Sequence, residues 1–326
     1  MTTGARNLPD RVQERLARLR SVPRPGAAPI REEISFSFEF FPPATPETTQ
    51  SLWHCIESLA PLRPAFVSVT YGAGGGTRER THATVRRILA ETDLLPAAHL
   101  TCVAATRAEV DAVVREYGEA GVRHIVALRG DPPGGDSRFR PHPGGYRNAA
   151  ELVEGIQRID DFEISVAAYP EVHPEARSAK ADLDFLKRKI DAGAGRAITQ
   201  FFFDAGIYLR FVEKARAAGI SVPIVPGILP VTNFGRVRLF AARCGASVPG
   251  WLAELFEGLD EKPEIRQLVA TSVAAAQCQA LLESGVREFH FYTLNRPELT
   301  RAICHLLGAR AAVPADAVET AAAPTR

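Results

Sequence analysis

The cysteines of this chain form no recognisable metal or redox motif. Cys55, Cys102, Cys244, Cys278 and Cys304 are scattered along the sequence and odd in number. No two of them have the spacing of a zinc site or of a redox pair. This absence favours reduced thiols in the core of a cytosolic protein, with no bound metal.

An excess of charge and a long apolar run are also missing. The chain has 39 Lys and Arg against 38 Asp and Glu, a net charge of +1, so no global electrostatic attraction to nucleic acid or to an anionic membrane is expected. No apolar run is long enough to span a bilayer. With 326 residues, 46% of them hydrophobic and 24% charged, the composition is typical of a soluble globular protein that buries a sizeable core.

A repeated unit begins at residue 34, in which an apolar or β-branched run is followed by a turn and an amphipathic helix. Glycine ends several of the helical patterns, as at Gly121 and Gly193, which suits the position after a helix C-terminus. Helices are predicted, for example, over Glu109–Ala120, Ala179–Ala192, Ile207–Ala218 and Pro297–Leu307. Strands are predicted over Ile34–Phe41, Ala65–Tyr71, Ala98–Val103, His124–Gly130, Glu163–Tyr169, Arg196–Phe203, Pro223–Leu229 and Glu288–Leu294.

Strands that alternate with helices predict a parallel sheet, and eight such units fit a (β/α)8 TIM barrel of the α/β class best. The alternative is a doubly wound open sheet, which usually has a glycine fingerprint at its first strand–helix turn. That turn reads Pro-Pro-Ala-Thr-Pro here. We expect a single barrel domain over residues 31–310, an N-terminal extension over 1–30 with a short amphipathic helix, and a disordered tail over 311–326.

The most informative stretch is the first predicted strand. Phe36, Phe38 and Phe40 alternate with Ser35, Ser37 and Glu39, so one face of the strand is aromatic and the other is small and polar. Two prolines follow at once and should end the strand. Because the neighbouring serines indicate a narrow interior, the enclosed Glu39 carboxyl is a candidate general acid.

Polar residues that could bind a ligand or take part in catalysis lie at the ends of the other strands. Barrel enzymes have their active sites at these strand ends. Several have a second interpretation. His173 and Glu175 could indicate a metal, but no further ligand has zinc-site spacing. Arg188 and Lys189 fit either a diphosphate site or a solvated helix face.

Seven segments together resemble the bacterial 5,10-methylenetetrahydrofolate reductases, over roughly residues 31–308. They are Ser-Phe-Glu-Phe-Phe-Pro-Pro (37–43), Phe-Val-Ser-Val-Thr-Tyr-Gly (66–72), His-Ile-Val-Ala-Leu-Arg-Gly-Asp (124–131), Ser-Val-Ala-Ala-Tyr-Pro-Glu-Val-His-Pro-Glu-Ala (165–176), Ala-Ile-Thr-Gln-Phe-Phe-Phe-Asp (197–204), Pro-Gly-Ile-Leu-Pro (226–230) and Phe-Tyr-Thr-Leu-Asn-Arg (291–296).

The resemblance implies a flavoprotein that binds FAD at the C-terminal face of the barrel. NADH or NADPH would reduce the flavin and leave, and methylenetetrahydrofolate would then take its place and be reduced to 5-methyltetrahydrofolate, which supplies methyl groups for methionine synthesis. The family is usually oligomeric, so a homo-oligomer is expected. The chain is too short for the regulatory domain of the eukaryotic enzymes, which favours NADH.

The resemblance also assigns residues by motif. Glu39 would protonate N10 of the substrate as general acid, and Asp131 would lie between flavin and pterin and stabilise the iminium cation formed on ring opening. Substrate contacts are implied for Thr70, Asp131, Gln200, Phe240 and Arg296. Flavin contacts are implied for Thr70, Tyr71, Ala73, His99, Arg129, Gly130, Asp131, Ala149, Tyr169, His173, Ala176, Asp182, Arg188 and Lys189.

The chain departs from its relatives at Phe185, where they often have Asn, and at Arg236, where they have Gln. Two other functions remain open at this point. One is a different flavin-dependent barrel oxidoreductase, for example one that acts on proline. The other is a barrel that binds folate without redox chemistry, such as a pterin methyl carrier or transferase.

Overall fold

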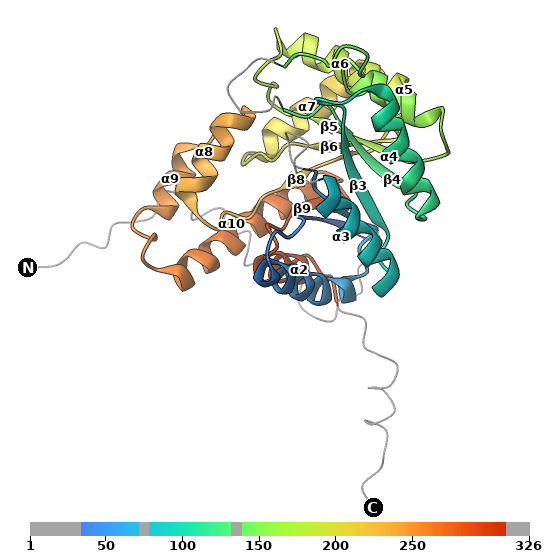
Figure 1. Ribbon diagram of the computed structural model, residues 1–326. Helices are drawn as coiled ribbons and strands as arrows, with labels where there is room; N and C mark the ends of the chain where they lie inside the picture. Colours follow the sequence, from blue (N-terminus) through green and yellow to red (C-terminus); the bar gives the residue numbers. More distant parts are fainter. Residues whose placement is uncertain (1–33, 72–77, 132–138, 311–326) are drawn as a thin grey trace, which may run out of the picture.

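The computed structural model describes residues 34–71, 78–131 and 139–310. The predicted N-terminal helix, Ala73 and the predicted tail lie outside the described residues. The strands form one parallel sheet in the order β7-β6-β5-β4-β3-β2-β1-β9-β8, and helices surround it (Figure 1). The strands are β1 (Ser35–Phe40), β2 (Phe66–Val69), β3 (Pro96–Thr101), β4 (His124–Leu128), β5 (Glu163–Ala168), β6 (Arg196–Thr199), β7 (Ile224–Val225), β8 (Gly227–Ile228) and β9 (Glu288–Tyr292).

The sheet closes into a barrel because β7 and β8 are two halves of one predicted strand. β7 pairs with β6 and β8 pairs with β9, so the two halves join the ends of the sheet. Pro226 separates them; it has no N–H to donate, and its carbonyl accepts a hydrogen bond of 3.0 Å from the His290 amide. The (β/α)8 prediction is therefore confirmed, with the seventh strand interrupted at its proline.

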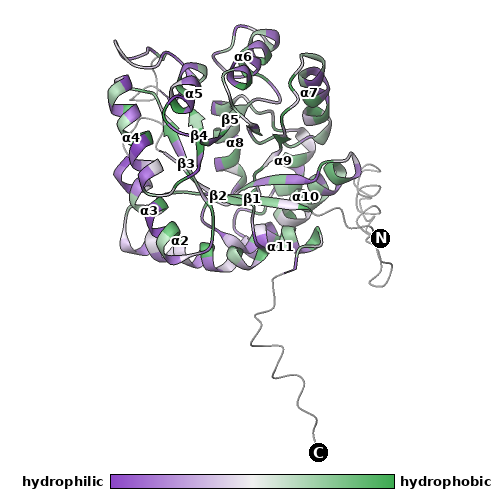
Figure 2. Cartoon of the chain, turned by 90° about the vertical axis from the view of Figure 1, so that its right-hand side faces the viewer, coloured by the Kyte–Doolittle hydropathy of each residue, from purple (hydrophilic) through white to green (hydrophobic). Residues whose placement is uncertain are grey.

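Side-chain caps fix the start of several helices. Thr45 caps α2 and Thr106 caps α4, each in a reciprocal capping box with the residue three positions later. Hydrophobic residues alternate with hydrophilic ones around the helices (Figure 2). The helices are α2 (Pro46–Leu59), α3 (Arg78–Glu91), α4 (Arg107–Glu119), α5 (Ala149–Gln157), α6 (Ala179–Asp191), α7 (Ala205–Ala217), α8 (Phe234–Cys244), α9 (Gly250–Phe256), α10 (Pro263–Glu283) and α11 (Pro297–Leu306), and a 3-10 helix, η1 (Ala60–Leu62), follows α2.

The two faces of β1 differ as the alternation predicts. Phe36, Phe38 and Phe40 are buried in the main hydrophobic cluster, which includes residues of α2 and α11. Ser37 and Glu39 lie on the opposite face, and β1 ends at Phe40, before the two prolines. A barrel has an interior and an outer layer, so the polar face of β1 lines the interior.

The chain between β8 and β9 is more elaborate than the repeat predicts. Three helices, α8, α9 and α10, replace the single expected helix, and α8 and α9 lie together on one side of the barrel (Figure 1). They form a second hydrophobic cluster with Phe201 and Phe203. These two phenylalanines were predicted to continue the sixth strand; they follow β6 instead, because this cluster buries them outside the sheet.

Within residues 34–71, 78–131 and 139–310, no helix combines the length and apolar character needed to cross a membrane.

Candidate functional site

The Glu39 carboxyl lies inside the barrel among histidines. Glu39 pairs in register with Ser68 of β2 and Tyr292 of β9, and its side chain is 14% exposed. One carboxyl oxygen, Oε2, is 3.4 Å from Nε2 of His99 and 3.7 Å from Nε2 of His290. Two imidazoles therefore face the same oxygen.

The two histidines have different surroundings. His290 is buried, and its Nδ1 lies 2.8 Å from the Ser37 hydroxyl, which fixes the ring beside β1. His99 is buried, and its Nε2 makes no hydrogen bond among the described residues. Burial lowers the pKa of His99, against the opposing effect of Glu39, so the ring is neutral at neutral pH.

The loop after β9 fixes the end of β1 next to Glu39. The Thr293 hydroxyl donates to the Glu39 carbonyl at 2.6 Å. The Asn295 side chain accepts from the Phe41 amide at 2.9 Å and donates to its carbonyl at 3.0 Å. Asn295 has φ of 55°, a conformation that asparagine tolerates better than most residues. Sequence reasoning missed these roles, because the contacts join positions about 250 residues apart.

A cavity of about 390 Å³ opens where β3, β4 and β5 end. Its size is in the range of small-molecule sites. Ten of the predicted cofactor residues line it: Tyr71, Arg129, Gly130, Asp131, Ala149, Tyr169, His173, Ala176, Asp182 and Lys189. The structure therefore brings together most of the residues assigned by motif to flavin binding.

The other predicted residues lie elsewhere. Thr70 follows β2 and His99 belongs to β3, and neither lines the cavity. Arg188 lines a different, polar cavity, which Arg107, Glu151 and Asp191 also line. Its guanidinium stacks on the Phe185 ring at 4.8 Å. Arg188 and Lys189 are adjacent on α6, and adjacent helical residues point in different directions.

The predicted substrate residues surround the same end of the barrel. Gln200 directly follows β6, and its side-chain oxygen accepts from the Phe201 amide at 3.0 Å. Phe240 of α8 is 47% exposed and stacks on Phe201, with ring centroids 5.3 Å apart. Arg296 is the N-cap residue of α11, just after β9. None of the three lines the 390 Å³ cavity.

The cavity contains a buried cation. Lys189 is 6% exposed, and its ammonium donates to the Ala167 carbonyl. Burial lowers the pKa of Lys189 to about 8, and Asp182 opposes this effect. The Asp182 carboxylate accepts from the His173 amide at 2.9 Å. The Lys189 ammonium thus has a carbonyl partner but no ion pair within 4.0 Å among the described residues, and it remains available to an anionic ligand.

Arg129 has a partner that sequence reasoning missed. Its guanidinium forms a two-point ion pair with Glu175, at 2.6 and 3.1 Å. Glu175 also lines the cavity, as do Thr101 and Phe185. Glu175 belongs to the family-like segment 165–176, so a position near the site was expected. Nothing in the sequence indicates that it pairs with an arginine 46 residues earlier.

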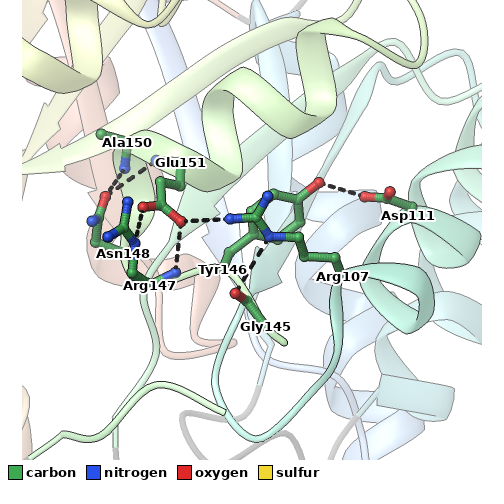
Figure 3. A network of polar contacts seen from close by, with 8 residues as sticks. All are labelled: Arg107, Asp111, Gly145, Tyr146, Arg147, Asn148, Ala150 and Glu151. Atoms are coloured by element: carbon green, nitrogen blue, oxygen red, sulfur yellow. Dashed lines mark hydrogen bonds and ion pairs between the residues drawn. The ribbon is translucent and has the colours of Figure 1, made fainter. Parts of the chain in front are cut away.

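The polar network in Figure 3 joins the first turn of α5, and the loop before it, to α4. Ala149, the first residue of α5, lines the cavity. Asn148 caps α5 by accepting from the amides of its first turn. Glu151 accepts from Arg107 at 3.0 Å and also pairs with Arg147. The Tyr146 hydroxyl donates to Asp111 of α4 at 2.6 Å. These contacts fix the start of α5, where Ala149 lines the cavity.

The described residues, which leave out 72–77 and 132–138, contain no group of three or more His, Cys, Asp or Glu side chains arranged to hold a metal ion.

Comparison with known proteins identifies the family. The family model described as methylenetetrahydrofolate reductase matches residues 26–308. The 5,10-methylenetetrahydrofolate reductase of Salmonella typhimurium is 53% identical over 283 residues, which cover 87% of this chain and 94% of that protein. Its Escherichia coli counterpart is 52% identical over the same shares of the two chains.

A more distant likeness exists to a solved structure of a Clostridium thermocellum protein described as binding two copies of 5-methyl-5,6,7,8-tetrahydrofolic acid. It covers 85% of this chain and 94% of that one, with a TM-score of 0.55 and 16% identity. At this identity the likeness shows the fold alone. The family match and the two close relatives are decisive: the chain belongs to the methylenetetrahydrofolate reductase family.

Proposed function

We propose that this protein reduces 5,10-methylenetetrahydrofolate to 5-methyltetrahydrofolate with NADH or NADPH as hydride donor and FAD as bound cofactor. The observation that carries the proposal is the convergence of ten motif-matched residues on one cavity at the C-terminal ends of the strands. The relatives that share about half of the sequence are named for this reaction. The product would supply methyl groups for methionine synthesis.

The residues of the cavity fit FAD. Lys189 is a buried cation with no ion pair within the described chain, which suits a diphosphate. The Thr101 hydroxyl lines the cavity, is buried and has no hydrogen-bond partner among the described residues, so a ligand could satisfy it. Asp182 and His173 would lie beside the ribose and adenine of FAD. When bound, FAD would accept a hydride from the nicotinamide and deliver it to the folate.

Gly130 matters because its backbone approaches β3 closely. Its φ is +86°, and a Cβ placed there would lie 2.7 Å from Val103 and 2.9 Å from Thr101. Only glycine fits this conformation and this space. The residue thus lets the chain turn from Arg129 to Asp131 at the cavity wall.

Glu39 would hold the proton that opens the five-membered ring of the substrate. Ring opening requires protonation of N10 while the C–N bond breaks, and a carboxyl in the barrel interior can deliver that proton. His99 and His290 face one oxygen of the carboxyl at 3.4 and 3.7 Å, and the Thr293 hydroxyl fixes the end of its strand.

The folate would be oriented and stabilised by four residues: Asp131, Gln200, Phe240 and Arg296. Asp131 is exposed at the cavity wall and can stabilise the cation that forms on ring opening. Gln200 can pair with the pterin edge or a nicotinamide amide. Phe240 presents an exposed aromatic face for stacking, and Arg296 can pair with a carboxylate of the glutamate tail.

Anaerobic half-reactions test the proposal. The purified protein should carry the visible absorbance of flavin, which NADH or NADPH should bleach and methylenetetrahydrofolate should restore, with 5-methyltetrahydrofolate as product. Protein without flavin that still binds folate would instead support a carrier or transferase. Flavin that proline reduces and methylenetetrahydrofolate does not reoxidise would support a different barrel oxidoreductase.

A further inference from the structure

A second cavity lies between α6 and α7, behind one wall of the candidate active site. Its volume is about 300 Å³, and the residues after β5 close one side of it. The two cavities share the wall residues Ala167, Tyr169, Asp182 and Lys189. The rest of its lining comes from facing sides of α6 and α7, which the proposed reaction does not use.

The lining is apolar on two sides. Leu183 and Leu186 of α6 face Ile207 and Phe211 of α7 across the cavity. Leu186 and Phe211 are buried and belong to the main hydrophobic cluster. A ligand with an apolar body would therefore gain favourable contacts on both sides.

The cavity also carries two unpaired cations. Arg210 and Lys214 lie four residues apart on α7, so they occupy the same helix face, and both are exposed. Neither side chain makes an ion pair or a hydrogen bond with any residue in the part of the chain that the structure describes. Two lysines of α6 differ, because Lys180 and Lys187 each pair with an aspartate four residues later.

The carboxylates of the cavity are already engaged by backbone amides. Glu171 accepts from the Ser247 amide at 2.7 Å, and Asp182 accepts from the His173 amide at 2.9 Å. Each carboxylate thus has a backbone donor at one oxygen, whereas Arg210 and Lys214 have no partner among the described residues. This lining attracts an anion rather than a cation.

We propose that the cavity between α6 and α7 binds a small organic anion with an apolar body, such as an aromatic carboxylate. Its carboxylate would lie between Arg210 and Lys214, and its ring would pack between the two helices. The site adjoins the candidate active site through the shared wall, and the proposal does not depend on the reductase activity.

Isothermal titration with 1-naphthoate tests the site. The protein is titrated in excess FAD and without folate or nicotinamide, and one binding event is expected. The double variant Arg210→Glu with Lys214→Glu should weaken binding about tenfold or more, because two ion pairs become two repulsions. Ala179→Phe, at an exposed lining position at the start of α6, should obstruct the cavity and also weaken binding.

Lys180→Glu is the matched control. It reverses a charge on the same surface outside the cavity lining, and 1-naphthoate affinity should stay within about twofold of wild type. Circular dichroism verifies the fold, and Arg210→Gln with Lys214→Gln provides a milder test if the reversed variant unfolds. No 1-naphthoate binding at millimolar concentration, or equal affinity of the charge-altered and wild-type proteins, would overturn the proposal.

Discussion

Replacement of Lys189 by methionine separates the stability of the protein from its affinity for the cofactor. Burial lowers the pKa of Lys189 from 10.5 to about 8. At ~1.4 kcal/mol for each unit of pKa, the native state is destabilised by about 3 kcal/mol while the lysine is protonated. Methionine removes this cost, and it also removes the hydrogen bond to Ala167, which contributes about 1 kcal/mol.

The pH dependence has a definite sign. The folded pKa is below the unfolded value, so between about pH 8 and 10.5 the unfolded chain binds more protons than the folded chain. This group therefore makes stability rise with pH across that window, and its full cost is present at neutral pH. FAD-free Lys189→Met protein should be more stable than wild type by about 2 kcal/mol at neutral pH, with the advantage lost near pH 10.

The same substitution should weaken cofactor binding. A charge-assisted contact to a diphosphate contributes roughly 1.5–3 kcal/mol, so the Kd for FAD should rise by about ten- to a hundredfold. Urea unfolding of FAD-free protein and fluorescence titration with FAD measure the two effects. Arg188→Ala, at the neighbouring exposed position, should change both much less. A Lys189→Met protein that is less stable than wild type and binds FAD equally well would refute the reasoning.

Three further substitutions test the site. Asp131→Asn should slow the reaction with methylenetetrahydrofolate more than flavin reduction by nicotinamide, because only the former develops a cation; equal effects in stopped-flow traces would count against the assignment. Asn295→Gly keeps the left-handed conformation but removes both bonds to Phe41, so urea unfolding should show a loss of about 1–2 kcal/mol and the folate half-reaction should slow; unchanged stability would mean that the bonds contribute nothing. Phe240→Ala should raise the KM for methylenetetrahydrofolate with little change in flavin reduction, and an unaltered KM would exclude a stacking role.

Much of the barrel was predictable because its periodicity is local. The alternation of phenylalanine with serine and glutamate in β1 specifies which face enters the core, and the structure confirms it. The strand ends were predicted one to four residues too late at several positions, such as Phe203. After β6, Phe201 and Phe203 continue the apolar pattern beyond the last ladder bond, because they pack against helices outside the sheet.

The details of the site depend on contacts between distant positions. The pairing of Arg129 with Glu175 and the bonds between Asn295 and Phe41 join loops that only the closed barrel brings together. The separation of Arg188 from Lys189 follows from helix geometry, but the sequence does not show which of the two faces the cavity. Three helices between β8 and β9 have no counterpart in the simple repeat.

The role of Glu39 is the central claim, and Glu39→Gln tests it most directly. Glutamine keeps the shape of the side chain and can still donate a hydrogen bond, but it cannot release a proton. Anaerobic stopped-flow should show flavin reduction by nicotinamide at a rate close to wild type, which serves as the internal control for folding and cofactor binding. Reoxidation by methylenetetrahydrofolate should fall by about 10²–10⁴-fold, as expected for a lost general acid. A variant that reoxidises within a few-fold of wild type would contradict the assignment of Glu39 as the acid.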